Sequence, residues 1–376
     1  MLSAWVAWIA RVETYMEHLE RVLAVRTDPD LVLALQDSDE PMVSMDTLRP
    51  LAQANIAFMD GLMASASESA LTAVPLLVQL VRDWSVHGER ARNSTYAPVV
   101  EALVPRISDV AAPRILLPGS GTGRLAFMLG ERLEGAQIVA LDPDEPAQFA
   151  AAFMLTAGEM QFGADDDKDQ REARPPAPTL PYVIYPSIHV SIHWASTAHR
   201  LAGVQVPDVP LRALKRVEET TNISFTVGGL EDFAWEEDFA EEGAATRDTF
   251  FHFHAVATCF VLDVFADMRR SLRILRAMLQ RHGGLWINLG PFAFPEPNEG
   301  HVGAAAGAQR GAVPLTAAQS LHLVRAAGFE VLEERLVEGC EYNALPSYLE
   351  RTVRTCLFFV ARPKAERQSD GGKVEL

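Results

Sequence analysis

The sequence predicts an α/β fold with a mostly parallel central sheet for most of the chain. From Arg114 onward, short apolar runs typical of buried strands alternate with segments of helical spacing. A glycine-rich turn joins the first of these runs to a helix. Residues 1–110 instead show helical spacing with few strand-like runs. The 376-residue chain is therefore expected to contain a helical subdomain at 1–110, an α/β domain at 111–362 and a disordered tail at 363–376.

Within the α/β domain, the expected strands and helices alternate along the chain. The expected strands are 114–117, 137–141, 223–227, 255–262, 285–289, 330–337 and 356–360, and the expected helices are 121–133, 145–157, 265–279 and 316–327. The last two strands lie close in sequence, which favours an antiparallel pair at the edge of the sheet. Charged and proline-rich residues at 160–180 indicate a surface insertion.

The charge of the chain argues against two classes of partner. With 50 acidic and 33 basic residues, the formal net charge is −17. A protein of this sign repels nucleic-acid phosphates and anionic membrane surfaces, so neither partner is expected. The sequence has no run of about 18 apolar residues, so a transmembrane helix is not expected either.

The cysteines and the first residues bear on the cellular compartment. Three scattered cysteines are too few for a disulfide framework or a zinc site, which favours a reducing environment. The apolar start is followed by Glu13, Glu17 and Glu20, which is typical of an amphipathic helix rather than of a signal peptide. We expect a cytoplasmic protein, with the nucleus as the other compartment that fits.

The strongest local signal is the loop that follows the first strand. Gly119, Gly121 and Gly123 alternate with two small polar residues ahead of a helix. Glycines let the backbone turn sharply and let a ligand approach it closely. The spacing G-x-G-x-G differs from the G-x-G-x-x-G of dinucleotide sites and suits a nucleoside joined to an amino acid. An ordinary tight turn would show the same glycines, so the loop alone leaves both interpretations open.

Asp142 adds weight to the ligand-binding interpretation. It follows the second strand, where a carboxylate can accept hydrogen bonds from both hydroxyls of a ribose. Enzymes that use NAD and enzymes that use S-adenosyl-L-methionine (SAM) share this device. The alternative is that Asp142 caps the following helix.

Six segments, taken in order, resemble one enzyme family. They are RDWSVHGERARNSTYAPV (82–99), LLPGSGTGRLAF (116–127), YPSIH (185–189), PDV (207–209), TCFVLD (258–263) and GGLWINLGP (283–291). Together they are similar to the carnosine N-methyltransferase (N2227-like) family of SAM-dependent methyltransferases, over about residues 75–362. The resemblance implies a Rossmann-like class I SAM-dependent methyltransferase sheet, with the N-terminal helical subdomain contributing to the cofactor site.

The resemblance also implies which residues bind SAM. Gln79 and Arg82, three apart on one helical face, would reach over the cofactor, and Arg82 would pair with its carboxylate. The alternative for Arg82 is an exposed arginine that pairs with Asp83 or Glu89. The other implied cofactor residues are Gly119, Gly121, Gly123, Asp142 on the ribose, Glu231 or Asp232 beside the adenine, and Cys259.

For the methyl acceptor, the resemblance implies a catalytic role for Asp263, which ends the apolar run Val256–Leu262. In the family this aspartate holds the acceptor imidazole. A carboxylate that accepts the imidazole N–H fixes the tautomer, aims the other nitrogen at the methyl group and stabilises the developing charge. The alternative is that Asp263 is a helix N-cap. Tyr342 is retained from the family and is expected to bind substrate.

The chain departs from the family pattern in the acceptor pocket. Pro295 stands where the family has a histidine, and Thr352, Val353 and Arg354 stand where it has tyrosines. The cofactor half is therefore expected to be intact and the acceptor half altered. An inward-pointing Arg354 would pair with a substrate carboxylate, whereas an outward-pointing one would be a surface residue.

The histidines do not predict a metal site. His189 and His193 are four apart, but the preceding Tyr-Pro disfavours a regular helix there. His252 and His254 share one side of a strand-like run, and Asp248 precedes them. Three scattered residues do not form a coordination set, so no metal is expected.

The expected function is transfer of a methyl group from SAM to an imidazole nitrogen of a carnosine-like, histidine-containing small molecule or dipeptide. Direct displacement requires alignment of donor and acceptor but no covalent intermediate or metal. Three alternatives stay open: methylation of a protein histidine or another diverged acceptor, a catalytically silent SAM-binding protein, and an NAD-type oxidoreductase. The expected partner is a small-molecule or peptide acceptor, and a homodimer is an open alternative.

Overall fold

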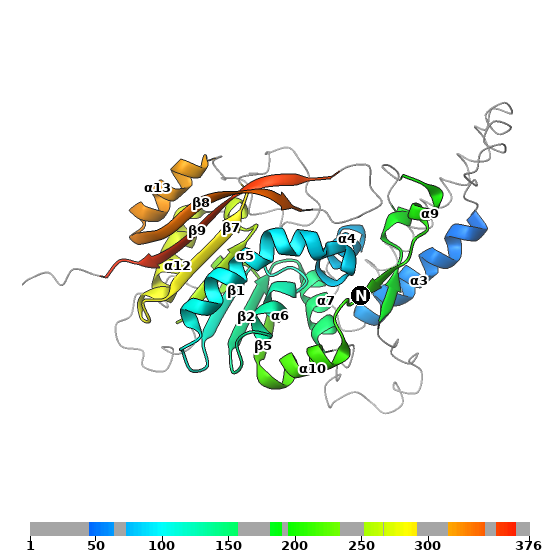
Figure 1. Cartoon of the computed structure of the whole chain (residues 1–376), viewed down its shortest axis with the longest axis horizontal. Coiled ribbons are helices and arrows are strands. Elements are labelled where there is room, and N and C mark those ends of the chain that lie inside the picture. Colours follow the sequence, from blue (N-terminus) through cyan, green and yellow to red (C-terminus); the bar gives the residue numbers. More distant parts are fainter. Residues whose placement is uncertain are drawn as a thin grey trace, which may run out of the picture.

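The computed structural model describes residues 45–63, 73–156, 181–189, 195–233, 252–265, 267–291, 315–342 and 351–365. Within these residues, a seven-stranded sheet forms the centre of the molecule (Figure 1). In spatial order its strands are β5 (Asn222–Val227), β2 (Gln137–Asp142), β1 (Arg114–Pro118), β6 (Ala255–Cys259), β7 (Leu285–Gly290), β9 (Val353–Pro363) and β8 (Phe329–Glu341).

The first five strands of this order run parallel to one another. Strand β9 pairs antiparallel with β7 on one side and with β8 on the other. The predicted α/β class, the Rossmann-like methyltransferase sheet and its antiparallel edge pair are therefore confirmed. The strand order reverses at β1, because β2 and β5 extend from one side of it and β6 and β7 from the other. Ligands of open α/β sheets bind beside the carboxyl ends of the strands at such a reversal.

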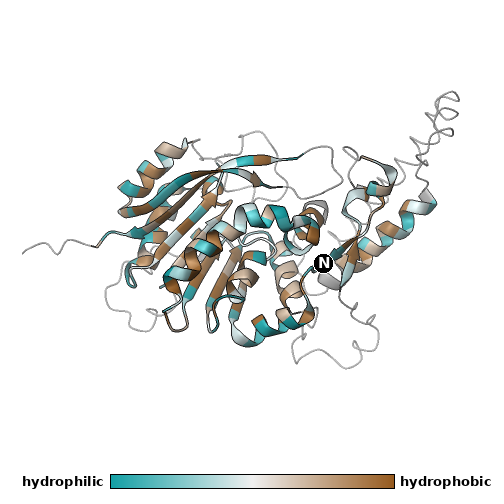
Figure 2. Cartoon of the chain, in the orientation of Figure 1, coloured by the Kyte–Doolittle hydropathy of each residue, from teal (hydrophilic) through white to brown (hydrophobic). Residues whose placement is uncertain are grey.

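Helices cover both faces of the sheet. Side chains of a strand alternate between faces, so Ile115 and Leu117 pack in one hydrophobic cluster and Leu116 in another. The first cluster includes α5 (Glu89–Ile107) and α6 (Arg124–Gly130), and the second includes α12 (Met268–Gln280) and α13 (Ala317–Ala326). Figure 2 shows the apolar strands in brown between helices that also carry polar surface.

A third cluster lies beside the β5 edge of the sheet. It is built by α3 (Met45–Met63), α4 (Ala73–Trp84), α7 (Glu145–Leu155) and a two-stranded hairpin of β3 (Tyr182–Ile184) and β4 (Val204–Val206). The aromatic rings of Phe58, Phe153 and Tyr182 pack against one another at its centre, with centroids 5.3–6.3 Å apart. The short elements η2 (Pro186–His189) and α9 (Thr197–Arg200) and helix α10 (Leu211–Thr220) complete this side (Figure 1).

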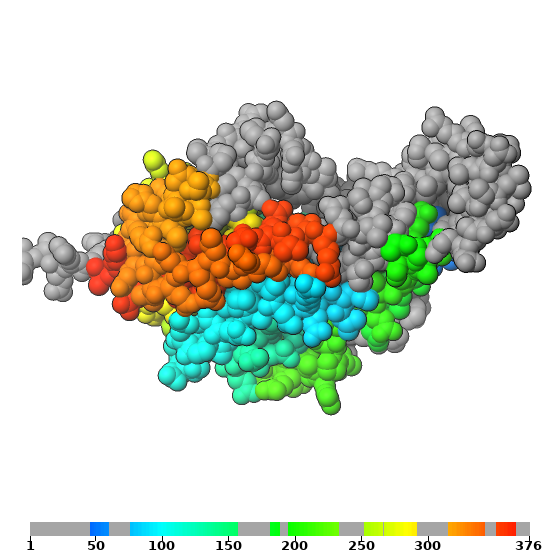
Figure 3. Space-filling model, turned by 45° about the horizontal axis from the view of Figure 1, so that its top comes forward, coloured from blue at the N-terminus to red at the C-terminus, as the bar shows by residue number. Residues whose placement is uncertain are grey.

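Helix α5 is held against the antiparallel edge pair. The Ser94 hydroxyl accepts a hydrogen bond from the backbone N–H of Glu341 at 3.0 Å, and Arg106 pairs with Glu333 at 3.2 Å. Figure 3 shows β8 and β9, in orange and red, lying along the cyan surface of α5. The α5 helix therefore bridges the N-terminal residues and the far edge of the sheet.

The strand expected at 255–262 is shorter in the structure. Strand β6 ends at Cys259, Phe260 takes a left-handed backbone with φ of 60°, and a 3-10 turn, η4 (Leu262–Val264), follows. The apolar run continues past the strand because Val261 and Leu262 in the turn are buried as well. The next helix begins at Met268, with Asp267 as its N-cap, rather than at Phe265.

Two polar residues of the strands, Thr258 and Asn288, form hydrogen bonds inside the core. The Trp286 indole donates to the Thr258 hydroxyl at 2.9 Å, and that hydroxyl donates to Asn288 Oδ1 at 2.8 Å. Asn288 in turn donates to the carbonyl of Leu357 at 3.1 Å. All three side chains are fully buried, so this network joins β6, β7 and β9 and satisfies polar groups that would otherwise destabilise the sheet.

Several predicted features lie outside the described residues: the whole insertion at 160–180, Pro295, His193, Asp248 and most of the tail. In the part of the chain that the structure describes, no helix is long and apolar enough to cross a bilayer.

Candidate functional site

The glycine loop lies between the carboxyl ends of β1 and β2. Gly119 and Gly123 have positive φ values of 65° and 81°, and a Cβ there would lie 2.3 Å from Val261 and 2.8 Å from Ala151. These two glycines are required by packing as well as by backbone geometry. Gly121, with φ of 53°, differs, because a Cβ there would meet only Gln79 Oε1 at 3.8 Å and Arg82 Nη2 at 4.0 Å. Gly121 therefore faces both side chains predicted to reach over the cofactor.

Asp142, the last residue of β2, is hydrogen-bonded to this loop. One of its carboxylate oxygens accepts from the N–H of Gly121 at 2.8 Å and the other from the N–H of Asp144 at 2.9 Å. Burial raises the pKa of Asp142 to about 6, against the opposing effect of these two hydrogen bonds. The carboxylate thus lies where the loop and β2 meet, and each oxygen retains a lone pair for a ligand hydroxyl.

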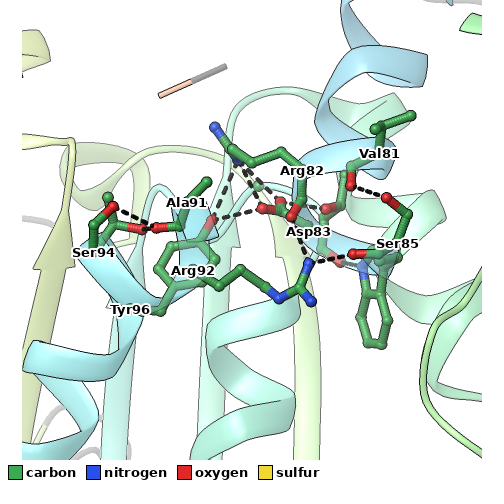
Figure 4. Close-up of polar contacts among 12 residues, drawn as sticks. Val81, Arg82, Asp83, Ser85, Ala91, Arg92, Ser94 and Tyr96 are labelled. Atoms are coloured by element: carbon green, nitrogen blue, oxygen red, sulfur yellow. Dashed lines mark hydrogen bonds and ion pairs between the residues drawn. The ribbon is translucent and has the colours of Figure 1, made fainter. Parts of the chain in front are cut away.

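Arg82 is a buried cation with a fixed orientation. Its Nε and Nη2 donate to the two oxygens of Asp83 at 2.7 and 2.9 Å, and only 15% of its side chain is exposed (Figure 4). The pairing with Asp83 that the alternative named is present, but the exposure that it assumed is wrong, because the pair is enclosed by the loop and by α5. Two-point pairing leaves Nη1 available to another anion.

Sequence reasoning did not place Asp83 at the site. This fully buried carboxylate accepts hydrogen bonds from the Thr122 hydroxyl at 2.6 Å and the Tyr96 hydroxyl at 3.0 Å, as well as from Arg82. Burial alone would raise the pKa of Asp83, but the Arg82 charge and these hydrogen bonds bring it below its ordinary value. The adjacent Arg-Asp pair in the sequence was the signal that two such charges share one environment.

Helix α4 is fixed to the glycine loop by further contacts. The Trp84 indole donates to the carbonyl of Thr122 at 2.7 Å. Arg92 Nη1 donates to the carbonyls of Arg82 and Ser85, both at 2.8 Å. Figure 4 shows the Arg92 guanidinium pointing toward Arg82 and Ser85. The Arg-Asp-Trp-Ser segment therefore carries the side chains of the site and also holds them in place.

Gln79 lies one helical turn before Arg82. Its Oε1 is buried and has no hydrogen-bond partner among the described residues. A buried acceptor without a donor is unfavourable unless a ligand supplies the missing hydrogen. Because this oxygen faces Gly121, a ligand bound over the glycine loop is in position to supply the missing donor.

Two further predicted site residues, Cys259 and Asp263, lie at and just after the end of β6. Cys259 is buried, and burial raises the pKa of its thiol, so the sulfur is neutral and not a nucleophile. Asp263 lies four residues on, in η4, with 5% of the residue exposed. The alternative that it is the N-cap of the next helix is wrong, because Asp267 accepts the N–H groups of Arg269 and Arg270. The Asp263 carboxyl is therefore buried beside the reversal point of the sheet without a capping role.

Tyr342 contacts side chains from three other parts of the chain. Its ring lies 5.1 Å from the ring of Phe260, and the guanidinium carbons of Arg82 and Arg354 lie 5.4 and 5.8 Å from its centroid. The Nε of Arg354 is buried. Arg354 is thus on the inner side of β9, in accordance with the inward-pointing alternative.

The two candidate acids after β5 have different partners. Glu231 accepts from the Ser271 hydroxyl at 2.8 Å and from the N–H of Asp267 at 3.4 Å, so it supports the start of α12. Among the described residues, Asp232 accepts only the N–H of Gly229, at 3.0 Å, and it is exposed. Of the two carboxylates, that of Asp232 has more capacity left for a ligand.

The histidines of the β6 segment lie at the opposite end of the sheet. The His254 ring stacks on His282 with centroids 4.3 Å apart, and its Nδ1 accepts the N–H of Arg114 at 3.0 Å. Burial, together with the neighbouring His282 and Arg114 charges, lowers the pKa of His254. Among the described residues, no group of three potential ligands is suited to a metal ion.

Comparison with known proteins identifies the family of the chain. The family model described as carnosine N-methyltransferase matches residues 62–162 and 177–365. A protein named carnosine N-methyltransferase from Schizosaccharomyces pombe is 30% identical over 281 residues, which are 73% of this chain and 66% of that protein. One of the same name from Rattus norvegicus is 28% identical over 225 residues, 58% of this chain and 46% of that protein.

A Drosophila melanogaster relative named carnosine N-methyltransferase unmet is 26% identical over 311 residues, 81% of this chain and 58% of its own length. The chain therefore spans between 46% and 66% of the length of these three curated relatives. Since the family model covers well over half of its residues, the chain belongs to the carnosine N-methyltransferase family.

Proposed function

We propose that this chain is a SAM-dependent methyltransferase that methylates an imidazole nitrogen of a carnosine-like, histidine-containing small molecule or dipeptide. The observation that carries the proposal is the convergence at Gly121. A glycine loop at the sheet reversal there faces an unpartnered buried Gln79 Oε1 and the oriented guanidinium of Arg82. Family membership supports the same activity.

The residues present fit SAM group by group. The unpartnered oxygen of Gln79 is suited to the ammonium of the methionine moiety, and Arg82 Nη1 to its carboxylate. Asp142 is suited to the ribose hydroxyls, at the carboxyl end of β2. We assign the adenine amino group to Asp232 rather than to Glu231, because Glu231 is already bound by Ser271.

When bound, SAM supplies a methyl group that its sulfonium already activates. The protein has to orient the acceptor, and Asp263 is the residue we assign to this task. Its buried carboxylate would accept the N–H of the imidazole, which leaves the lone pair of the other ring nitrogen free to attack. The same carboxylate would stabilise the positive charge that the ring gains during transfer.

Ligand-induced stabilisation separates this proposal from the other classes. SAM and S-adenosylhomocysteine should raise the melting temperature of the chain, whereas NAD should not. Labelled SAM should then transfer its methyl group to carnosine or free histidine. Stabilisation by NAD alone would contradict the proposal, as would SAM binding without transfer to any imidazole acceptor.

The Asp263→Asn variant tests the assigned residue. We expect at least a ~10-fold loss of kcat, because an amide can present an N–H where the imidazole N–H must be accepted. Stabilisation by S-adenosylhomocysteine should be retained, because Asp263 is not among the residues assigned to SAM. Unchanged turnover would show that this carboxylate does not hold the acceptor.

A further inference from the structure

Arg354 has no carboxylate partner among the described residues. It lies on β9 opposite Cys340 of β8, and its Nε is buried without a hydrogen-bond partner there. Its guanidinium carbon lies 5.8 Å from the centroid of the Tyr342 ring, and its charge also acts on the Cys356 thiol two residues on. A buried guanidinium nitrogen that donates to nothing is unfavourable, and an acceptor atom of a ligand would satisfy it.

The neighbouring charges are already matched to other partners. Arg82, which lies near the same ring, is paired at two points with Asp83. Glu341 precedes Tyr342, but its Oε1 lies 3.3 Å from Arg90 Nε and 3.8 Å from Arg351 Nη1. In the described part of the chain, Arg354 is therefore the cation at this aromatic cluster whose charge is not compensated.

The position of Arg354 relates it to the proposed acceptor. Tyr342 packs on Phe260, and Phe260 lies three residues before Asp263 at the end of β6. The contacts therefore run from Arg354 through Tyr342 to Phe260, three residues before the carboxylate assigned to the imidazole. A histidine-containing acceptor carries an imidazole and, a few bonds away, a carboxylate.

We propose that Arg354 binds the carboxylate of the methyl acceptor, so that the chain selects imidazole compounds that retain a carboxylate over their decarboxylated amine analogues. This inference rests on the proposed function, since it places its substrate in the same site. The guanidinium provides two-point recognition of a carboxylate, and Tyr342 holds its plane by a cation–π contact.

The test compares carnosine with β-alanylhistamine, which has the same imidazole and amine but no carboxylate. In the wild-type chain, kcat/KM should be roughly 10- to 100-fold higher for carnosine, the range expected for a charge-assisted hydrogen bond. Arg354→Gln should remove this preference, chiefly by raising KM for carnosine, and should leave β-alanylhistamine unaffected. Arg354→Lys should keep part of the preference for carnosine, because the lysine ammonium retains the positive charge but not the two-point geometry of the guanidinium.

A matched control is Arg362→Gln on the same strand, where the arginine is half exposed and paired with Glu330. It should leave both acceptors unaffected. Stabilisation by S-adenosylhomocysteine should be the same for all variants, which excludes loss of the cofactor site as the cause.

Two outcomes would overturn the inference: equal kcat/KM for the two acceptors in the wild-type chain, or an equal loss for both in Arg354→Gln. Calorimetric binding of the same two compounds to the chain loaded with S-adenosylhomocysteine separates it from the proposed function. Preferential binding of carnosine without methyl transfer would overturn the proposed function and support the carboxylate contact. Equal binding, or binding of neither compound, would overturn the carboxylate contact.

Discussion

The hydroxyl of Thr122 lies 2.6 Å from a carboxylate oxygen of Asp83, and this contact joins the glycine loop to helix α4 inside the protein. The same carboxylate holds Arg82 at two points. The loop that faces the ligand and the helix that supplies its charged side chains therefore form one unit. A change that disturbs either side of this contact is expected to affect stability and cofactor binding together.

The first prediction concerns Asp83→Asn. The change leaves the Arg82 guanidinium buried without a compensating charge, so we expect a loss of about 3–5 kcal/mol in the free energy of unfolding. Denaturant unfolding measures it, and calorimetry with S-adenosylhomocysteine should show weaker binding. The control is Glu334→Gln, which breaks an exposed pair with Arg325 and should change stability by less than about 1 kcal/mol. Similar effects of the two changes would contradict the assigned role of Asp83.

The second prediction concerns the pH dependence of stability through Asp142. Its pKa in the folded chain is about 6, above the value of 3.8 for an ordinary aspartate. Between these values the folded state binds more protons than the unfolded state, so this residue makes the chain less stable as the pH rises from about 4 to 6. The effect is at most about 3 kcal/mol and is complete above pH 6.

Comparison with Asp142→Asn isolates this contribution. The difference in unfolding free energy between wild type and variant should move in favour of the variant as the pH rises through this window, and should then stay constant. The variant should also bind SAM roughly 10-fold more weakly, because it has lost a carboxylate acceptor. A difference that does not vary with pH would show that Asp142 is not buried as described.

The third prediction separates Asp232 from Glu231. We expect Asp232→Asn to weaken binding of S-adenosylhomocysteine about 10-fold with little effect on stability, because its carboxylate is exposed. Glu231→Gln should instead lower the free energy of unfolding by about 1 kcal/mol, since it weakens the contact with Ser271 at the start of α12. Isothermal calorimetry and urea unfolding of both variants decide the matter. The reverse pattern would move the adenine contact to Glu231.

Local sequence signals were sufficient for the framework of the sheet and for the glycine loop. The strands at 114–117 and 137–141, and the loop between them, are short-range features of apolar runs and glycines, and β1 and β2 match them within one residue. The three-residue strands β3 and β4 escaped prediction, because three residues are too few to show a period. The alternative of an exposed Arg82 was wrong, because Tyr96, which contacts Arg82, and Thr122, which contacts its partner Asp83, come from other elements.

The last prediction concerns Asp208, which joins Arg92 of α5 to Arg124, the first residue of α6. Its two oxygens accept from Arg92 at 2.5 Å and from Arg124 at 2.6 Å, and all three side chains are at least 90% buried. Burial, followed by the Arg124 charge, lowers the pKa of Arg92, so the two guanidinium groups repel each other without the aspartate. Asp208→Asn should therefore cost about 3–5 kcal/mol in the free energy of unfolding.

In contrast to Asp83→Asn, the Asp208→Asn variant should retain its affinity for S-adenosylhomocysteine under conditions where it is folded. The reason is that Asp208 contacts neither Arg82 nor the side chain of Gln79. Its backbone N–H donates to the carbonyl of Trp84 in α4 at 2.7 Å, and its carboxylate pairs with Arg124 of α6. Guanidinium unfolding gives the first quantity and calorimetry at low temperature the second. A parallel loss of affinity would show that this buried ion cluster also shapes the cofactor side of α4.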